Sequence, residues 1–596
     1  MGMQAFSEMM ILGLDIPKTI QNWLTPVWLL GLGCFAGLLC IGLMGLLFKK
    51  VLSRIEVLQR VADERNRLLA YTTVTSIVLA IIMVLSTQVG SVVVPQVGAD
   101  TLSDAPAPSL LINSLVIFIA CWFVSLAFYV CCWHRTISEG STLLNEGPLK
   151  PILTVCLVLA AWGVVGTAVV DSPTFVIRSL VQMPFAGVER WDATVPVDAN
   201  EEGFLANVDV RIGMMSKFVI KSDQDIAFAF RPHSELRVGV EAPIVPAGLA
   251  VSLAEVDPTV LPSLLPDVES LSTLESVYIV NNGADTARVE IYAETEVFST
   301  QAMVIPTIAL IMFIALMIYI IQRMLLPRLF AVALSTYKSE VNQPLFPLVA
   351  AIASIALVGF VWIPYNTFGE DIKMLKDTGI TLITVLTIFI ALWAASTSVA
   401  DEIEGRTALT VLSKPLNRRS FVIGKFFGIS WALVLMYVIL GVVFLVAVAY
   451  KPIFDAREVT QPTPPWERCY AEMIQIVPGL ALSFMETIVF AALSVAISTR
   501  LNLLGNFSIC LIVYMLGHLT PLLVESSAAG FDIIQFFGQL IATVFPNLEN
   551  FNVEAAIAKG IYVPFEYLSW AFLYCLIYSV IAMLLALLMF EDRDLA

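Results

Sequence analysis

FFGISWALVLMYVILGVVFLVAVAY, residues 426–450, contains no charged side chain over 25 consecutive positions. A helix of about 20 apolar residues crosses the hydrocarbon core of a bilayer, which is roughly 30 Å thick. This stretch is therefore predicted to be a transmembrane helix, and it indicates that the chain is a helical membrane protein.

Ten further runs of this kind predict eleven spans in all. Two of them hold one ionisable side chain each: Glu486 in 473–498 and His518 in 501–524. The other eight are free of charge and cover residues 26–48, 71–94, 110–133, 151–170, 302–322, 345–365, 378–400 and 567–590. The segment 533–545 is apolar but too short to cross, and we interpret it as a re-entrant or surface helix.

The composition agrees with a membrane protein. Hydrophobic residues make up 58% of the chain and charged residues 14%, against about 45–50% and about 25% in soluble globular proteins. So few charges cannot cover the surface of a soluble protein of 596 residues. The net charge of −16 also argues against nucleic acid as a partner, because phosphate binding needs clustered Lys and Arg.

The distribution of Lys and Arg predicts the orientation of the spans. If residues 49–70 face the cytoplasm, the alternate short loops and the C-terminal tail on that side hold 18 basic residues, and the opposite loops with the N-terminus hold seven. Cytoplasmic loops carry the excess of Lys and Arg. The N-terminus and residues 172–300 are therefore expected outside, and the C-terminus is expected in the cytoplasm.

Residues 172–300 form a polar insert with 19 acidic and 8 basic residues. Alternating stretches predict short strands, and Asn281–Asn282–Gly283 is a turn signal. We expect a small β-sandwich standing between the fourth and fifth spans. The predicted strands are Lys217–Ile220, Ile226–Phe230, Leu236–Val240, Ser276–Val280 and Arg288–Ala293.

The predicted fold class is thus an all-α polytopic membrane protein with about eleven transmembrane helices and one extracytoplasmic β-sandwich-like insert. We expect four consecutive parts. They are a four-helix membrane module over 1–171, the acidic insert over 172–300, the fifth span with an amphipathic helix over 301–344, and a six-span core over 345–596.

Motifs for chemistry are missing from the sequence. It has no G-x-x-x-x-G-K-[ST] loop for nucleotide phosphates and no H-E-x-x-H or C-x-x-C pattern for a metal. We therefore predict no catalytic residue, no metal site and no cofactor in this chain.

The stretch 400–428, ADEIEGRTALTVLSKPLNRRSFVIGKFFG, lies on the predicted cytoplasmic side. Asp401, Glu402 and Glu404 open it, and Lys414, Arg418 and Arg419 close it. Acids at the start and bases at the end complement the dipole of a helix. Either a short interfacial helix that only anchors the neighbouring spans, or a helix that meets a partner, fits this pattern.

The same stretch resembles the first intracellular helix in the membrane subunits of type-2 ABC exporters. The family pattern is an acidic pair, Gly and Thr, an apolar run, Ser-x-Pro, one or two Arg, and Gly-Lys. Arg406 departs from it by separating Gly405 from Thr407. The segments 492–518 and Phe545–Phe551 are also similar to this family, and the resemblance covers about residues 328–596. The matching residues are Glu402, Glu404, Gly405, Thr407, Leu409–Leu412, Ser413, Pro415, Arg418, Arg419, Gly424 and Lys425.

This resemblance implies a permease subunit of an ABC exporter in the bacterial inner membrane. Such permeases pair as homo- or heterodimers, and separate ATPase subunits that bind ATP and Mg²⁺ dock on the cytoplasmic helices. The residues it assigns to ATPase coupling are Glu402, Glu404, Gly405, Arg406, Thr407, Pro415, Arg418, Arg419 and Lys425. It also implies an elbow helix before the core, and Pro327–Glu340 fits one, because Phe330, Leu334 and Tyr337 form an apolar stripe.

Two ionisable residues inside predicted spans, Glu486 and His518, are candidates for a substrate path or a subunit interface, because a carboxylate in a bilayer is costly. The alternative for Glu486 is a protonated group hydrogen-bonded between helices. For the whole chain, the alternative function is an ABC-driven scaffold that transmits force to its outer domain without moving a solute. An ion-coupled transporter would show more intramembrane charges and paired broken helices.

Overall fold

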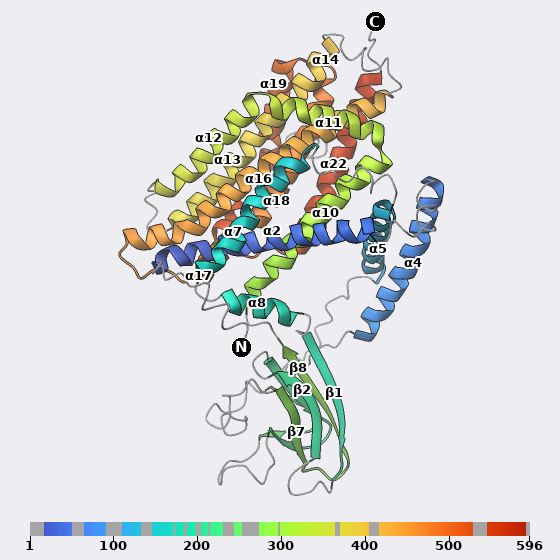
Figure 1. Ribbon diagram of the computed structural model, residues 1–596, viewed down its shortest axis with the longest axis vertical. Coiled ribbons are helices and arrows are strands. Elements are labelled where there is room, and N and C mark those ends of the chain that lie inside the picture. Colours follow the sequence, from blue (N-terminus) through green and yellow to red (C-terminus); the bar gives the residue numbers. More distant parts are fainter. Residues whose placement is uncertain are drawn as a thin grey trace. The chain divides into compact units, whose positions relative to one another are not determined.

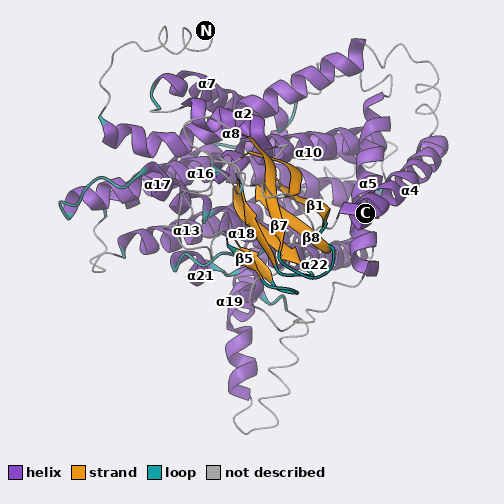
Figure 2. Cartoon of the chain, turned by 90° about the horizontal axis from the view of Figure 1, so that it is seen from below, coloured by secondary structure: helices purple, strands orange, loops and turns teal. Residues whose placement is uncertain are grey.

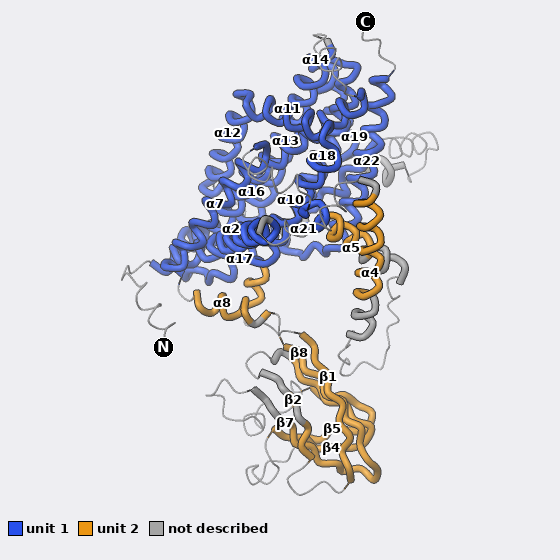
Figure 3. The backbone as a smooth tube through the Cα atoms, turned by 45° about the vertical axis from the view of Figure 1, so that its right-hand side comes forward, with its two compact units in different colours: residues 1–64, 127–171, 304–596 blue, residues 65–126, 172–303 orange. Residues whose placement is uncertain are grey.

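The computed structural model (Figure 1) confirms a mostly helical membrane protein with a β insert. Contact clustering divides the chain into two compact units, coloured in Figure 3. Unit 1 comprises residues 1–64, 127–171 and 304–596, and unit 2 comprises residues 65–126 and 172–303. The four-part division predicted above stays a prediction. The residues that the structure describes are 17–50, 65–90, 110–132, 146–170, 173–183, 187–197, 204–211, 215–230, 243–252, 273–295, 299–363, 370–404, 417–527 and 545–591.

Each of the eleven predicted spans falls on a helix. Eight of the described helical segments are long and apolar enough to cross a membrane, and three shorter apolar segments lie within α4 (Arg65–Gly90), α5 (Leu110–Cys132) and α19 (Leu503–Ser527). The count of eleven therefore stays a prediction. The eight are formed by α2 (Lys18–Lys50), α7 (Leu149–Val165), α10 (Val304–Leu325), α12 (Leu345–Gly359), α13 (Asp371–Ala395), α16 (Arg418–Glu458), α17 and α18 (Trp466–Ile474 and Val477–Ser498) and α22 (Phe565–Glu591).

Short 3-10 and π-helical turns extend several of these helices, and shorter helices connect others. The turns are η2 (Gly166–Ala168), η8 (Phe360–Trp362), η9 (Ser396–Ala400) and η10 (Leu548–Phe551). The short helices of unit 1 are α14 (Asp401–Glu404) and α21 (Glu554–Ala558), and unit 2 adds α8 (Pro173–Gln182) and η7 (Thr300–Met303). The predicted helix at 533–545 lies outside the described residues, apart from its last position.

Helix α16 is the central helix of unit 1. Its 41 residues extend for about 60 Å at 1.5 Å per residue, so it reaches beyond both faces of a bilayer core. It packs against α11 (Pro327–Asn342), α12, α13, α17 and α18. Helix α11 confirms the predicted amphipathic helix, with Pro327 in its first turn and Phe330 and Tyr337 buried. The core residues of 345–590 thus assemble around one long helix.

Contacts inside unit 1 agree with the predicted alternation of loops. Segments assigned to the same side of the membrane meet each other at the same end of the bundle. At the end predicted outside, Asn22 Nδ2 donates to Pro464 O at 2.8 Å, and Lys376 pairs with Glu472. At the other end, Arg323 lies 3.9 Å from Glu146, and Arg418 Nη1 donates to Glu591 O at 3.2 Å. Which end faces the cytoplasm stays a prediction.

The insert folds as two packed antiparallel sheets, whose strands are orange in Figure 2. Fourteen of the residues that face inward from both sheets are aliphatic or aromatic and nearly inaccessible, among them Phe218, Ile220, Phe228 and Ile291, so the predicted sandwich is confirmed. One sheet has the order β1 (Gly187–Val195), β8 (Ala287–Thr295), β3 (Met215–Ser222) and β6 (Ala250–Ser252). The other has β2 (Phe204–Arg211), β7 (Thr273–Asn281), β4 (Ile226–Ala229) and β5 (Ile244–Val245).

The predicted turn after Asn281 joins the two sheets, because β7 and β8 belong to different ones. The Asn281 side chain holds the turn. Its Oδ1 accepts from the Gly283 N–H at 2.9 Å, and its Nδ2 donates to Asp285 O at 2.8 Å and to Val195 O. The predicted strand at 236–240 lies outside the described residues.

Glycines let three helices of unit 1 approach closely. A Cβ added to Gly31 of α2 would lie 2.5 Å from Leu159 O and 2.7 Å from the Gly163 nitrogen of α7. Gly33 and Gly37 meet Ile308 and Met312 of α10 in the same way. This run of small residues therefore serves packing within the chain, as small residues do between membrane helices.

We expect Gly31→Ala to lower the thermal midpoint of the purified protein, by an amount equivalent to about 1–3 kcal/mol, because the obstructing atoms are backbone and cannot turn aside. Gly42→Ala is the matched control, since a Cβ added there meets nothing within 4 Å and gains the same helix propensity. Equal midpoints for the two variants would show that the contact of α2 with α7 is looser than described.

Candidate functional site

The first candidate site is the Lys425 cluster, which we define as Glu340, Thr397, Glu402 and Lys425. These residues come from α11, η9, α14 and α16. Lys425 is buried, with 6% of the residue exposed, and its ammonium lies 2.5 Å from Glu402 Oε1. It also lies 5.4 Å from the centre of the Phe421 ring. The ion pair fixes the start of the predicted coupling stretch to α16, the central helix of unit 1.

Glu340 is the second carboxyl of this cluster and is 4% exposed. The Thr397 hydroxyl lies 3.4 Å from its Oε1. Burial raises the pKa of the Glu340 carboxyl to about 8, although the charge of Lys425 and the Thr397 hydroxyl act in the opposite direction. One ammonium thus neutralises one carboxylate, and the second carboxyl is held largely neutral near pH 7.

The remaining predicted coupling residues divide into three groups. Arg418 and Arg419 are exposed at the start of α16. Glu404 ends α14. Gly405, Arg406, Thr407 and Pro415 lie outside the described residues. Lys425, which was grouped with them, is buried and bound internally, so its place in the structure suits positioning of Glu402 better than direct contact with a partner.

Helix α13 ends in a π-helix, η9, immediately before α14. Its Ser396 Oγ lies 2.9 Å from Asn506 Nδ2 of α19, which also donates to Ser494 Oγ at 2.7 Å. All three residues are buried. π-Helical turns are rare and frequently occur at functional sites. This one connects α13 to the predicted coupling stretch, and hydrogen bonds of Asn506 tie it to α18 and α19.

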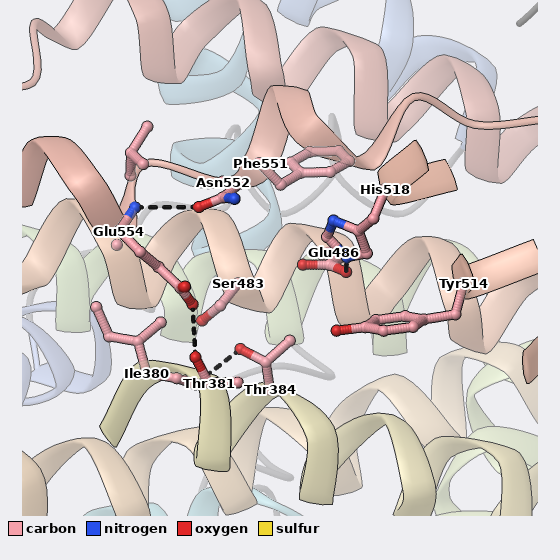
Figure 4. Close-up of a pocket in the computed structure, with 12 residues that line it drawn as sticks. Ile380, Thr381, Thr384, Ser483, Glu486, Tyr514, His518, Phe551, Asn552 and Glu554 are labelled. Atoms are coloured by element: carbon pink, nitrogen blue, oxygen red, sulfur yellow. Dashed lines mark hydrogen bonds and ion pairs between the residues drawn. The ribbon is translucent and has the colours of Figure 1, made fainter. Parts of the chain in front are cut away.

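The second candidate site is a pocket of about 280 Å³ near the opposite end of unit 1 (Figure 4). Glu486 of α18 and His518 of α19, predicted separately, meet here: Glu486 Oε1 lies 3.3 Å from His518 Nε2. His518 Nδ1 lies 3.7 Å from Glu549 Oε2. Glu486 is therefore hydrogen-bonded between two helices and lines a cavity as well. The lining residues are Ile380, Thr381, Thr384, Gly479, Ser483, Glu486, Tyr514, His518, Phe551, Asn552, Val553 and Glu554.

Glu554 adds a second carboxyl to the pocket from the first turn of α21. The Thr381 hydroxyl lies 3.0 Å from its Oε1. Burial raises the pKa of the Glu554 carboxyl to about 7, and the neighbouring Asp377 carboxylate contributes to the rise. The sequence analysis missed Glu554, because it lies between spans where a carboxylate is ordinary. For Glu486 and His518 the sequence did hold a usable signal, because the spans that carry them follow each other directly and form the helical hairpin of α18 and α19. Glu486 and His518 stand at similar distances before and after its turn at 499–502.

Three acidic groups also meet where α13 begins and α16 ends: Asp371, Asp455 and Glu458, with ligand atoms within 4.8 Å of one another. The Lys451 ammonium lies 2.9 Å from Asp455 Oδ1 and donates to Val361 O at 3.1 Å. A protein ammonium therefore already supplies positive charge here, and the group is explained as an ion-pair cluster.

The fold defines a polytopic helical membrane protein with a β insert. A family model described as ABC-2 family transporter protein matches residues 212–595. The match covers well over half of the chain and includes both the Lys425 cluster and the pocket, so this chain belongs to the ABC-2 transporter family. It also begins earlier than the resemblance over 328–596, inside the insert. No curated protein matches the chain.

Proposed function

We propose that this chain is the permease subunit of an ATP-driven exporter and that residues 401–419 dock a separate ATPase subunit, which binds ATP and Mg²⁺. Membership of the ABC-2 family is the observation that carries the proposal. The Lys425 cluster supports it, because it ties the start of this stretch to α16 and the π-helix η9 just before it to α11. Movement of a docked partner would therefore reach three helices of the bundle at once.

The proposed assembly is a dimer of permeases, identical or different, with two ATPase subunits in the bacterial inner membrane. The basic-residue count places the N-terminus and residues 172–300 outside and the C-terminus in the cytoplasm. In this orientation Arg418 and Arg419 are exposed toward the cytoplasm and the pocket opens near the outer face. A dimer agrees with the long apolar faces that the spans leave uncovered in one copy, although lipid covers such faces equally well.

The second candidate function is a scaffold that transmits force to its outer domain without moving a solute. The sandwich favours it, since this domain has a complete apolar core of its own and could receive a load. The pocket favours the exporter, because a cavity lined by two carboxyls inside a helix bundle is costly to keep and is of no use to a purely mechanical element.

We expect Glu404→Lys and Arg419→Glu to abolish co-purification with the ATPase subunit or to weaken it at least tenfold, while membrane insertion stays normal. Opposed like charges in an interface cost several kcal/mol. Glu402→Lys is unsuitable for this test, because it would also break the internal pair with Lys425.

Association is measured by pull-down of the ATPase from membranes at two salt concentrations, with Glu566→Lys as the control. Glu566 is an exposed glutamate at the start of α22, the other end of the bundle. If both reversals retain parental binding and parental salt dependence, residues 401–419 only anchor the bundle, and the docking assignment is wrong.

A further inference from the structure

The pocket around Glu486 has a definite charge. Among the described residues that line it, none is Lys or Arg, whereas two, Glu486 and Glu554, are carboxylic acids. Glu486 is 5% exposed, and one of its oxygens contacts His518. Figure 4 shows the other oxygen pointing away from the His518 ring into the pocket. The histidine of the lining, His518, already lies between the Glu486 and Glu549 carboxylates, so an anion would enter a pocket with an excess of acidic groups, and the pocket disfavours anionic ligands.

The hydroxyl groups of the pocket present oxygen lone pairs and not protons. Thr384 Oγ1 donates its hydrogen to Ile380 O at 2.9 Å, and Ser483 Oγ donates to Leu480 O at 3.1 Å. Thr381 Oγ1 lies 2.9 Å from Asp377 O and 3.0 Å from Glu554 Oε1, and one of these two acceptors takes its hydrogen. Each hydroxyl has one hydrogen. What remains toward the cavity is therefore two hydroxyl acceptors, Thr384 and Ser483, beside two carboxyls.

The side-chain nitrogens of the lining face carboxylate oxygens. Asn552 Nδ2 donates to Glu549 Oε1 at 3.1 Å, and the two ring nitrogens of His518 face Glu486 and Glu549. The Tyr514 hydroxyl can turn either way. A lining that is rich in acceptors, and whose side-chain nitrogens face carboxylates, is complementary to a ligand with several donors and no acceptor. A primary ammonium group, with three N–H donors and a positive charge, has these properties.

Aromatic rings complete the environment. Tyr514 and Phe551 line the pocket, and the Tyr514 ring packs edge-on against His518 with 4.6 Å between ring centres. Aromatic faces attract ammonium groups at close range. The volume, about 280 Å³, lies near the lower end for small-molecule pockets, and it leaves room for a short aliphatic chain behind the charged group.

A metal ion fits this pocket less well. Within the described part of the chain, the acidic group with ligand atoms inside 4.8 Å of one another is the one at Asp371, Asp455 and Glu458, outside the pocket. Glu486, Glu554 and His518 therefore do not bring three ligand atoms within that distance of one another.

We propose that this pocket binds the primary ammonium group of a small aliphatic amine, held by the Glu486 and Glu554 carboxylates. The inference rests on the proposed function, since it assigns the chemical class of the exporter's cargo. Glu486 is the inner acceptor, and Glu554 on α21 is the acceptor at the entrance. Ser483 and Thr384 accept the remaining N–H groups.

The test uses the purified full-length chain in nanodiscs and three probes of equal length: n-butylammonium, n-butyrate and n-butanol. We expect the ammonium alone to bind. Glu486→Gln and Glu554→Gln should each raise its Kd at least about tenfold, as expected for loss of a charged hydrogen-bond partner. Glu566→Gln removes an exposed carboxylate outside the pocket and should leave the Kd within about twofold.

Binding should also strengthen as the pH rises through about 7, because a carboxylate binds the cation and its protonated form does not. The groups that act on this transition are Asp377, Glu486, His518, Glu549 and Glu554. Glu554→Gln should flatten the rise, a readout that a purely structural role would not change.

The proposal would be overturned if butyrate or butanol bound as tightly as the amine, or if the amine showed no saturable binding. Parental Kd values in both pocket variants would also overturn it. So would displacement of the bound amine by KCl at constant ionic strength, which would indicate a site for an inorganic cation. Should Glu486→Gln not fold, the Glu554→Gln variant at the entrance decides the outcome. No ATPase takes part in the measurement, so its failure would leave the docking test at Glu404 and Arg419 unaffected.

Discussion

Lys425→Glu is expected to destabilise the protein by about 3–5 kcal/mol, the cost of leaving a buried charge uncompensated. The Lys425 ammonium is buried and lies 2.5 Å from Glu402. After the substitution this position would add a third carboxyl beside Glu402 and Glu340, with no cation between them. We expect loss of the monodisperse species and a thermal midpoint far below that of the parent, measured by fluorescence-detected gel filtration after heating.

Lys338→Glu provides the matched control. Lys338 lies on α11, close in sequence to Glu340, but its side chain is exposed, and the same change of charge should move stability by no more than about 0.5 kcal/mol. Combining Lys425→Glu with Glu402→Lys should restore part of the loss, because residues in contact are not additive. Equal midpoints for the parent and the single Lys425 variant would mean that the pair is open to solvent.

Glu340→Gln is expected to stabilise the protein at alkaline pH and to remove part of its pH dependence. Burial raises the pKa of the folded-state carboxyl to about 8, whereas in the unfolded chain it stays near 4.3. Between these values the folded state holds a proton that the unfolded state has released. Unfolding free energy therefore falls as the pH rises through this window and is fully retained below it. At about 1.4 kcal/mol for each pH unit, the loss is roughly 3–5 kcal/mol.

The measurement is the thermal midpoint of the parent and the variant from pH 4.5 to 9. The parent should lose stability relative to Glu340→Gln as the pH rises, and the difference should level off above about pH 8. Glu467→Gln replaces an exposed glutamate and should run parallel to the parent throughout. A parent and a Glu340 variant with parallel curves would place the ionised form of Glu340 in the folded protein at neutral pH.

The helical part of the fold could be predicted because the bilayer acts on single segments. A long uncharged run is apolar enough to cross the bilayer regardless of which helices surround it, and each predicted run lies on a helix. The elbow helix was implied by the family resemblance, and its apolar stripe located it. Phe330 and Tyr337 of that stripe lie on the buried face of α11.

The buried charges could not be predicted, because their compensation comes from distant residues. Lys376 and Lys451 count as loop lysines in the sequence, yet they are 1% and 0% exposed. Lys376 pairs with Glu472, almost a hundred residues further along the chain. Lys425 was assigned to ATPase coupling through its match to the Gly-Lys of the family pattern, and such a match does not tell whether the side chain turns inward.

The first strand of the insert was missed for a related physical reason. Strand β1 is at the edge of its sheet, and of its nine residues only Val195 is buried. Alternation of apolar and polar residues predicts a half-buried strand. An edge strand with few buried side chains therefore shows only weak alternation. The inner strands β3 and β8, which have one face in the core, were predicted correctly.

The π-helix at Ser396–Ala400 stores one surplus residue in the backbone between α13 and α14. If that residue passed out of the wide turn and the segment became α-helical, everything after it would turn by about 100° and shift by about 1.5 Å along the axis. The Glu402 side chain would then point in a different direction, away from Lys425. A change of register of one residue would thus couple a displacement of residues 401–404 along the α13 axis to a rotation of the same residues about that axis.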